Sequence, residues 1–279
     1  MADSTHILRK VSPSKWTVSR ESGRGPLLLA CVQTSQEGEH LRFESNWIPA
    51  ASIPADAVTS CLRTTSNTLS FWMCELSEES IEEGVLALAA DFSEVNPVHV
   101  VIFAWSELAD LDLRRSPGNT KIARLVETHV DVENLSLHSQ ALVAARLANL
   151  VRNYREARCR SYPTGRVLSL LLRAVTRGDI RLEDLKPKLR KGVEQEKSKN
   201  LALEAARAAA AKGWGAQRVS VEIKKGAISV ELLNEKGNPV GSLSYPLKGS
   251  RVKLNCKKGS RAAKIVEACR FAIESALKR

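Results

Sequence analysis

Apolar and polar residues alternate along the first part of the chain in short runs that are typical of strands. Such runs, bounded by Gly and Ser, predict strands over residues 16–19, 26–33 and 40–47. Residues 54–62 begin with a proline and fit a short helix. Residues 68–76 again have the pattern of a strand, so this region is expected to be rich in strands.

Helical spacing of apolar residues begins after Ser77, which can cap the clearest helix of this region. Its early turns are rich in glutamate, which the helix dipole favours there. Residues 98–105 are almost continuously apolar and β-branched, which predicts a central strand covered on both faces. With a strand over residues 125–132 and a long helix over residues 135–154, the pattern indicates a mixed α/β layered domain.

The spacing after residue 199 predicts a smaller module with the order helix, three strands, helix, of α/β or α+β class. In chain order its first four elements occupy residues 200–212, 217–224, 227–234 and 240–245. Residues 251–255 extend or follow the third strand, and Ser260 caps the closing helix.

A helical joint is expected between these two regions. An apolar helix over residues 165–177 stops at Gly178, and a second helix begins at about Leu182. Helix, glycine turn and basic helix is the outline of a helix-turn-helix reader of DNA. The alternative is a solvated basic linker, and the pattern favours neither.

Charge divides the chain in the same way. Residues 1–155 contain 14 Lys and Arg against 19 Asp and Glu, a net charge of −5, whereas residues 156–279 contain 28 against 12, a net charge of +16. We therefore expect an acidic α/β domain over residues 1–155, a basic joint over residues 156–199 and a basic module over residues 200–279. A surplus of this size usually faces a polyanion, and nucleic acid is the first candidate.

Composition narrows the class of protein further. No apolar run approaches the roughly 18–20 residues that span a bilayer, and the N-terminus lacks a signal-peptide pattern. We expect a cytoplasmic protein without membrane insertion. The six cysteines and five histidines are scattered, with no C-x-x-C pair, so no metal or cofactor is expected.

The basic module resembles double-stranded RNA-binding domains in its order of elements. That family has a lysine-rich start to its closing helix, and Lys257-Lys258-Gly259-Ser260-Arg261-Ala262-Ala263-Lys264 is similar to it in altered spacing. The family also probes a minor groove with the loop between its first two strands, which here is only Lys224-Lys225-Gly226. The resemblance implies RNA as a slightly preferred ligand over DNA.

Two further patterns bear on catalysis. The order of the N-terminal elements is similar to that of the ribonuclease-H-like fold, whose chemistry needs clustered carboxylates, but the strands predicted over residues 16–19 and 26–33 contain none. Glu222-Ile223-Lys224 matches the E-x-K element of a class of nucleases, without the Asp on a preceding strand that the full motif requires. Trp214 is either a base-stacking residue or a hydrophobic anchor at a helix end. We expect no catalytic residues.

The sequence thus predicts a nucleic-acid-binding protein that acts by phosphate neutralisation. Cations near the start of the closing helix would converge on a phosphate with the exposed backbone N–H groups. The candidate contacts, in order of rank, are Lys257, Lys258, Arg261 and Lys264, then Lys186, Lys188, Arg190, Lys191, Lys197 and Lys199, then Lys224 and Lys225. The acidic domain would serve assembly or partner contact. The alternatives are a protein that oligomerises and coats a genome or transcript and, ranked below it, a metal-dependent nuclease.

Overall fold

The protein is mixed α/β, with two antiparallel sheets in two compact units, Met1–Arg190 and Lys191–Arg279. The computed structural model describes residues 6–12, 15–16, 28–29, 48–49, 53, 55–64, 66–116, 120–215, 218–224, 226–247 and 251–278. We call the two parts the N-terminal unit and the C-terminal unit. The three-part division by charge stays a prediction.

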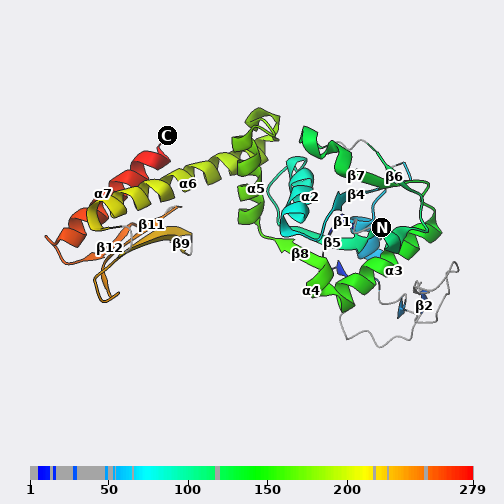
Figure 1. Ribbon diagram of the computed structural model, residues 1–279, viewed down its shortest axis with the longest axis horizontal. Coiled ribbons are helices and arrows are strands. Elements are labelled where there is room, and N and C mark those ends of the chain that lie inside the picture. The colour runs from blue at the N-terminus through cyan, green and yellow to red at the C-terminus, as the bar shows by residue number, and fades with distance from the viewer. Residues whose placement is uncertain are drawn as a thin grey trace. The chain divides into compact units, whose positions relative to one another are not determined.

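A six-stranded sheet forms the centre of the N-terminal unit (Figure 1). Its strands are β1 (His6–Val11), β4 (Leu69–Cys74), β5 (Val98–Ala104), β6 (Leu113–Arg115), β7 (His129–Val132) and β8 (Cys159–Tyr162). Their order across the sheet is β6-β7-β4-β1-β5-β8, and every neighbouring pair is antiparallel. A short pair, β2 (Leu28–Leu29) and β3 (Ile48–Pro49), is separate from it.

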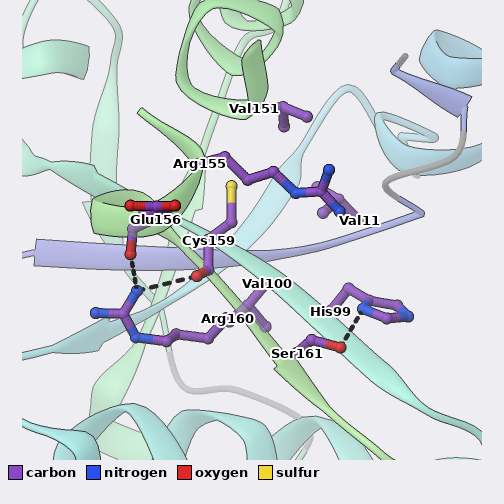
Figure 2. A pocket seen from close by; sticks show the side chains of 9 residues that line it. All are labelled: Val11, His99, Val100, Val151, Arg155, Glu156, Cys159, Arg160 and Ser161. Carbon is purple, nitrogen blue, oxygen red and sulfur yellow. Dashed lines mark hydrogen bonds between the residues drawn. The ribbon is translucent and has the colours of Figure 1, made fainter. Parts of the chain in front are cut away.

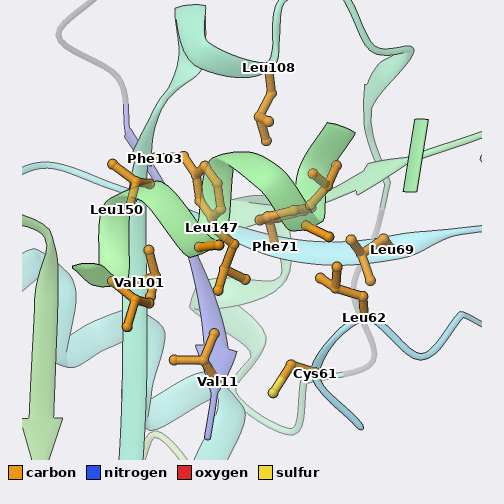
Figure 3. Packing of buried hydrophobic residues seen from close by; sticks show 14 of the residues in the cluster. Val11, Cys61, Leu62, Leu69, Phe71, Val101, Phe103, Leu108, Leu147 and Leu150 are labelled. Atoms are coloured by element: carbon orange, nitrogen blue, oxygen red, sulfur yellow. The ribbon is translucent and has the colours of Figure 1, made fainter. Parts of the chain in front are cut away.

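Both faces of this sheet bury apolar side chains. On one face Phe71 and Phe103 meet edge to face, with ring centroids 5.8 Å apart, in a cluster that includes α3 (Leu137–Asn153) and α1 (Ala55–Cys61). Figure 3 shows this cluster around β1 and β5. On the other face Leu8 packs against Gly84 of α2 (Glu78–Ala90), where an added Cβ would lie 2.4 Å from a Leu8 methyl carbon. The glycine therefore allows α2 to approach the sheet.

Several predicted elements of this unit are confirmed. The strand predicted over residues 98–105 corresponds to β5, and the strand predicted over residues 68–76 corresponds to β4. Ser77 caps α2, its hydroxyl accepting a hydrogen bond from the Ser80 N–H at 3.2 Å. The predicted helix over residues 135–154 corresponds to α3.

Other predictions need correction. Lys15 and Trp16 lie in a turn, not at the start of a strand, and residues 17–19 and 40–47 lie outside the described residues. Of the strand predicted over residues 26–33, only β2 is described. The first strand of the sheet, β1, was missed because its sequence contains Arg9 and Lys10. Arg9 fits there because its guanidinium donates to the carbonyls of Cys61 and Ser70.

The remainder of the unit is helical. It contains α4 (Arg155–Arg158), α5 (Thr164–Arg177) and the 3₁₀ helices η3 (Trp105–Leu108), η4 (Ala123–Thr128) and η5 (Leu182–Asp184). The first half of the strand predicted over residues 125–132 thus belongs to η4, and the second half forms β7. The second helix of the predicted joint, α6 (Pro187–Trp214), begins five residues later than expected, because a proline is best accommodated in the first turn.

The C-terminal unit is a four-stranded meander with two helices. Its strands are β9 (Val219–Lys224), β10 (Ala227–Leu233), β11 (Pro239–Pro246) and β12 (Lys253–Cys256), in the order β12-β11-β10-β9, and α7 (Arg261–Leu277) closes the unit. The predicted module had three strands. The segment predicted over residues 251–255 to extend or follow the third strand instead contributes to a fourth strand, β12, which pairs with β11 over Gly241–Ser244.

Its core lies between the sheet and the two helices. Ala202, Ala206 and Ala210 of α6 share this core with Val266 of α7 and Val230 of the sheet. The small alanines let the helices pack closely, so that the Cys269 thiol donates to the Ala206 carbonyl at 3.7 Å. Within the described part of the chain, no helix is long and apolar enough to cross a membrane.

Candidate nucleic-acid interface

The charge surplus of the protein lies entirely in the C-terminal unit. Residues 1–190 contain 23 Lys and Arg and 23 Asp and Glu, a net charge of zero. Residues 191–279 contain 19 against 8, which is the whole net charge of +11. The positive net charge is therefore confined to the smaller unit.

The arginines of α5 belong to the neutral N-terminal unit, where they pair with carboxylates of α2 and of the residues beside it. Arg166 Nε donates to Glu82 Oε1 at 2.6 Å, and Arg173 Nη2 donates to Glu82 Oε2 at 2.8 Å. The Glu82 side chain is only 9% exposed, so this carboxylate depends on its two partners. Arg177 lies 2.9 Å from Asp179.

Two predicted phosphate contacts near the start of α6, Lys186 and Lys188, also have polar partners within the N-terminal unit. Lys186 donates to the Asp91 carbonyl at 3.0 Å, and Lys188 lies 3.2 Å from Glu94. The Lys188 side chain is 76% exposed, so its ion pair is weak and can be exchanged for a phosphate. Arg190 is half-buried and forms no ion pair with a described carboxylate.

Further along α6, Lys199 pairs with Glu196, whose Oε2 lies 2.9 Å from the ammonium. Lys191 and Lys197 are exposed and have no ion pair with any carboxylate that the structure describes. This stretch therefore offers two unpaired cations of the three predicted.

Lys224 lies on the surface of β9 and forms an ion pair with Glu222. The hydrogen bond with that carboxylate raises the pKa of Lys224. Lys225 lies outside the described residues. No group of three His, Cys, Asp or Glu residues among those described is placed to hold a metal.

The best-ranked cluster lies where α7 begins. Lys257, Lys258 and Lys264 are exposed, and none pairs with a described carboxylate. Gly259, at a φ of +77°, makes the turn between the two lysines and the helix. The Ser260 hydroxyl caps α7 as predicted, accepting from the Ala263 N–H at 3.2 Å.

Arg261 has a different environment from its neighbours. Its Nη2 donates to the Gly213 carbonyl at 2.9 Å, and its guanidinium lies 5.5 Å from the centroid of the Trp214 ring. Arg261 thus joins the start of α7 to the end of α6. Trp214 is an anchor, since it packs against the core and its Nε1 donates to the Leu233 carbonyl at 2.7 Å.

Topology brings further cations to the same end of the unit. Cys256 at the end of β12 pairs with Gly241 of β11, close to the turn between β10 and β11. Figure 1 shows that α6 ends where α7 begins. Two exposed lysines that sequence reasoning missed, Lys212 and Lys236, lie on these elements. We call the six residues the basic end: Lys212, Lys236, Lys257, Lys258, Arg261 and Lys264.

The basic end is not uniformly positive, and it does not include the third predicted cluster. Glu235 lies in the turn between β10 and β11, where it pairs with Arg218 at 3.4 Å. Lys224 is at the opposite end of the sheet, because it pairs through Ala227 with Pro246. The ion pair between Arg218 and Glu235 and the position of Lys224 both follow from how the strands pair in the sheet, which the sequence alone does not show.

No protein-family model, curated protein or solved structure matches the chain.

Proposed function

We propose that the protein binds nucleic acid through the basic end of its C-terminal unit, neutralising phosphates with little dependence on base sequence. The observation that carries the proposal is that the whole net charge of +11 lies in this unit, together with exposed lysines at one of its ends. A bound polyanion stabilises clustered lysines, and the lysines displace its counterions when they bind its phosphates.

The start of α7 is suited to a phosphate in a second way. Lysines near a helix N-terminus oppose its dipole, by a few tenths of a kcal/mol each. A bound phosphate removes this conflict, because backbone N–H groups and ammonium groups then converge on one anion. Lys257, Lys258 and Lys264 are the proposed contacts, and Arg261 holds the helix start in place.

RNA is ranked slightly above DNA. The support is the resemblance in element order to double-stranded RNA-binding domains. This unit differs from the helix, three strands, helix order of that family by its fourth strand, β12. The neutral N-terminal unit would serve partner contact or assembly. If it assembles the protein into a coat, light scattering will show a size that grows with protein concentration before nucleic acid is added.

Two double variants with the same change in charge test the site. Lys257→Gln with Lys258→Gln removes two cations of the basic end, and Lys191→Gln with Lys197→Gln removes two from the early part of α6. We expect the first to weaken binding of a labelled RNA duplex by about tenfold near 0.1 M salt and to lower the salt slope by about 2, uniformly across sequences. The measurement is fluorescence anisotropy at several salt concentrations.

The second double variant is the matched control, and we expect it to lose less affinity. Equal losses in the two variants would show that attraction is spread over the unit. Unchanged binding in the Lys257 and Lys258 variant would remove the site assignment.

A further inference from the structure

The N-terminal unit contains a pocket of about 670 Å³ at the β8 edge of its sheet. His99 pairs with Val11 on one side and Ser161 on the other, so these three side chains form a row on one face. This is the face that α3 covers, and Val151 near the end of that helix lines the pocket from the other side. The volume is within the range of small-molecule sites.

Two charged groups of this pocket, Arg155 and Glu156, form no ion pair with any residue that the structure describes. Arg155 of α4 is exposed and has no ion pair with any described carboxylate, whereas Arg160 Nη1 donates to the carbonyls of Glu156 at 2.8 Å and Cys159 at 2.9 Å. Figure 2 shows the Arg155 guanidinium and the Glu156 carboxylate on opposite sides of the Cys159 side chain. The arginine is therefore available to an anion.

The rest of the lining, apart from the Glu156 carboxylate, consists of apolar side chains and polar groups with neutral partners. Val11 and Val151 supply apolar side chains, whereas Val100 follows His99 on β5 and its side chain points to the opposite face of the sheet. Burial raises the pKa of the Cys159 thiol, which therefore stays neutral at physiological pH. The Ser161 hydroxyl lies 2.8 Å from His99 Nδ1, which orients the ring and leaves Nε2 as a second polar group.

We propose that this pocket binds a small organic anion, with its carboxylate or phosphate on Arg155 and its apolar body against the valines. A planar guanidinium is suited to both head groups, since it donates two parallel hydrogen bonds to either. The inference does not depend on nucleic-acid binding, because every lining residue belongs to the N-terminal unit.

Calorimetric titration of the full chain with phenyl phosphate and with octanoate tests the proposal and distinguishes the two head groups. We expect at least one probe to bind with a Kd of about 1 mM or tighter. Arg155→Gln should weaken it about tenfold, the effect of losing a charged hydrogen-bond partner. Arg115→Gln is the control, because Arg115 is an exposed arginine of β6 at the opposite edge of the sheet.

A second measurement does not depend on any variant. Iodoacetamide labelling of Cys159, followed by peptide mass spectrometry, should slow in the presence of the bound probe, while labelling of half-buried Cys256 in the C-terminal unit should not change. Failure of both probes to saturate below about 10 mM would overturn the proposal. So would equal affinity of the Arg155 variant, or Cys159 labelling that ignores a saturating probe.

Discussion

At the scale of single residues, the environment of a charge decides what it can do. Glu82 is buried and accepts hydrogen bonds from two arginines of α5, so three charged residues hold α2 and α5 together. Lys257 and Lys258 are exposed with no described carboxylate beside them. The first group stabilises the fold, and the second is available to a ligand.

Replacing Glu82 tests the structural part of this contrast. Glu82→Gln should lower the free energy of unfolding by about 1–3 kcal/mol. This is less than for a fully buried pair, because its arginines are about half exposed and water can solvate them. Glu94→Gln, which removes the partner of exposed Lys188, should cost less than about 0.5 kcal/mol. Urea unfolding measures both, and equal effects would show that Glu82 has no special role.

At the scale of elements, the helices that begin with a capping serine were predictable. Ser77 and Ser260 mark the starts of α2 and α7 because an N-cap is a local interaction, readable within four residues. The missed strand β1 has Arg9 and Lys10 where a strand of a buried sheet would be apolar. Its place between β4 and β5 depends on pairing with residues more than 60 positions away.

The candidate site was predictable in its centre and not in its extent. Lys257, Lys258, Arg261 and Lys264 are close in sequence, so their cluster could be recognised directly. Lys212 and Lys236 join it only through the packing of α6 on α7 and the pairing of β10 with β11. The role of Arg261 as a link to Gly213 and Trp214 also required the fold.

The contact between α6 and α7 near the basic end is tight enough to test. A Cβ on Gly213 would lie 2.0 Å from Ile265 Cδ1, so Gly213→Ala should destabilise the protein by about 1–3 kcal/mol, although alanine favours helix formation. Ile265→Val removes that methyl carbon and should recover much of the loss in the double variant. Thermal unfolding of the single and double variants measures the coupling, and additive effects would contradict the proposed contact.

At the scale of the whole molecule, a neutral unit is joined to a unit that carries all of the net charge. The boundary between the two units lies after residue 190, so the basic residues 156–190 belong to the N-terminal unit, where several of them pair with carboxylates of α2 and its neighbours. The apparent contrast between an acidic half and a basic half is thus a contrast between a balanced unit and an unbalanced one. The unbalanced unit is where binding of a polyanion is expected.

The most direct test of this account is the dissociation constant of the full chain for duplex RNA, duplex DNA and single strands of equal length, measured at several salt concentrations. The account predicts that the logarithm of the association constant falls with the logarithm of the salt concentration at a slope of about −3 to −5. The cations of the basic end set this slope, and RNA is slightly preferred. No binding at about 50 mM salt, or a dissociation constant that does not change up to about 200 mM, would contradict it.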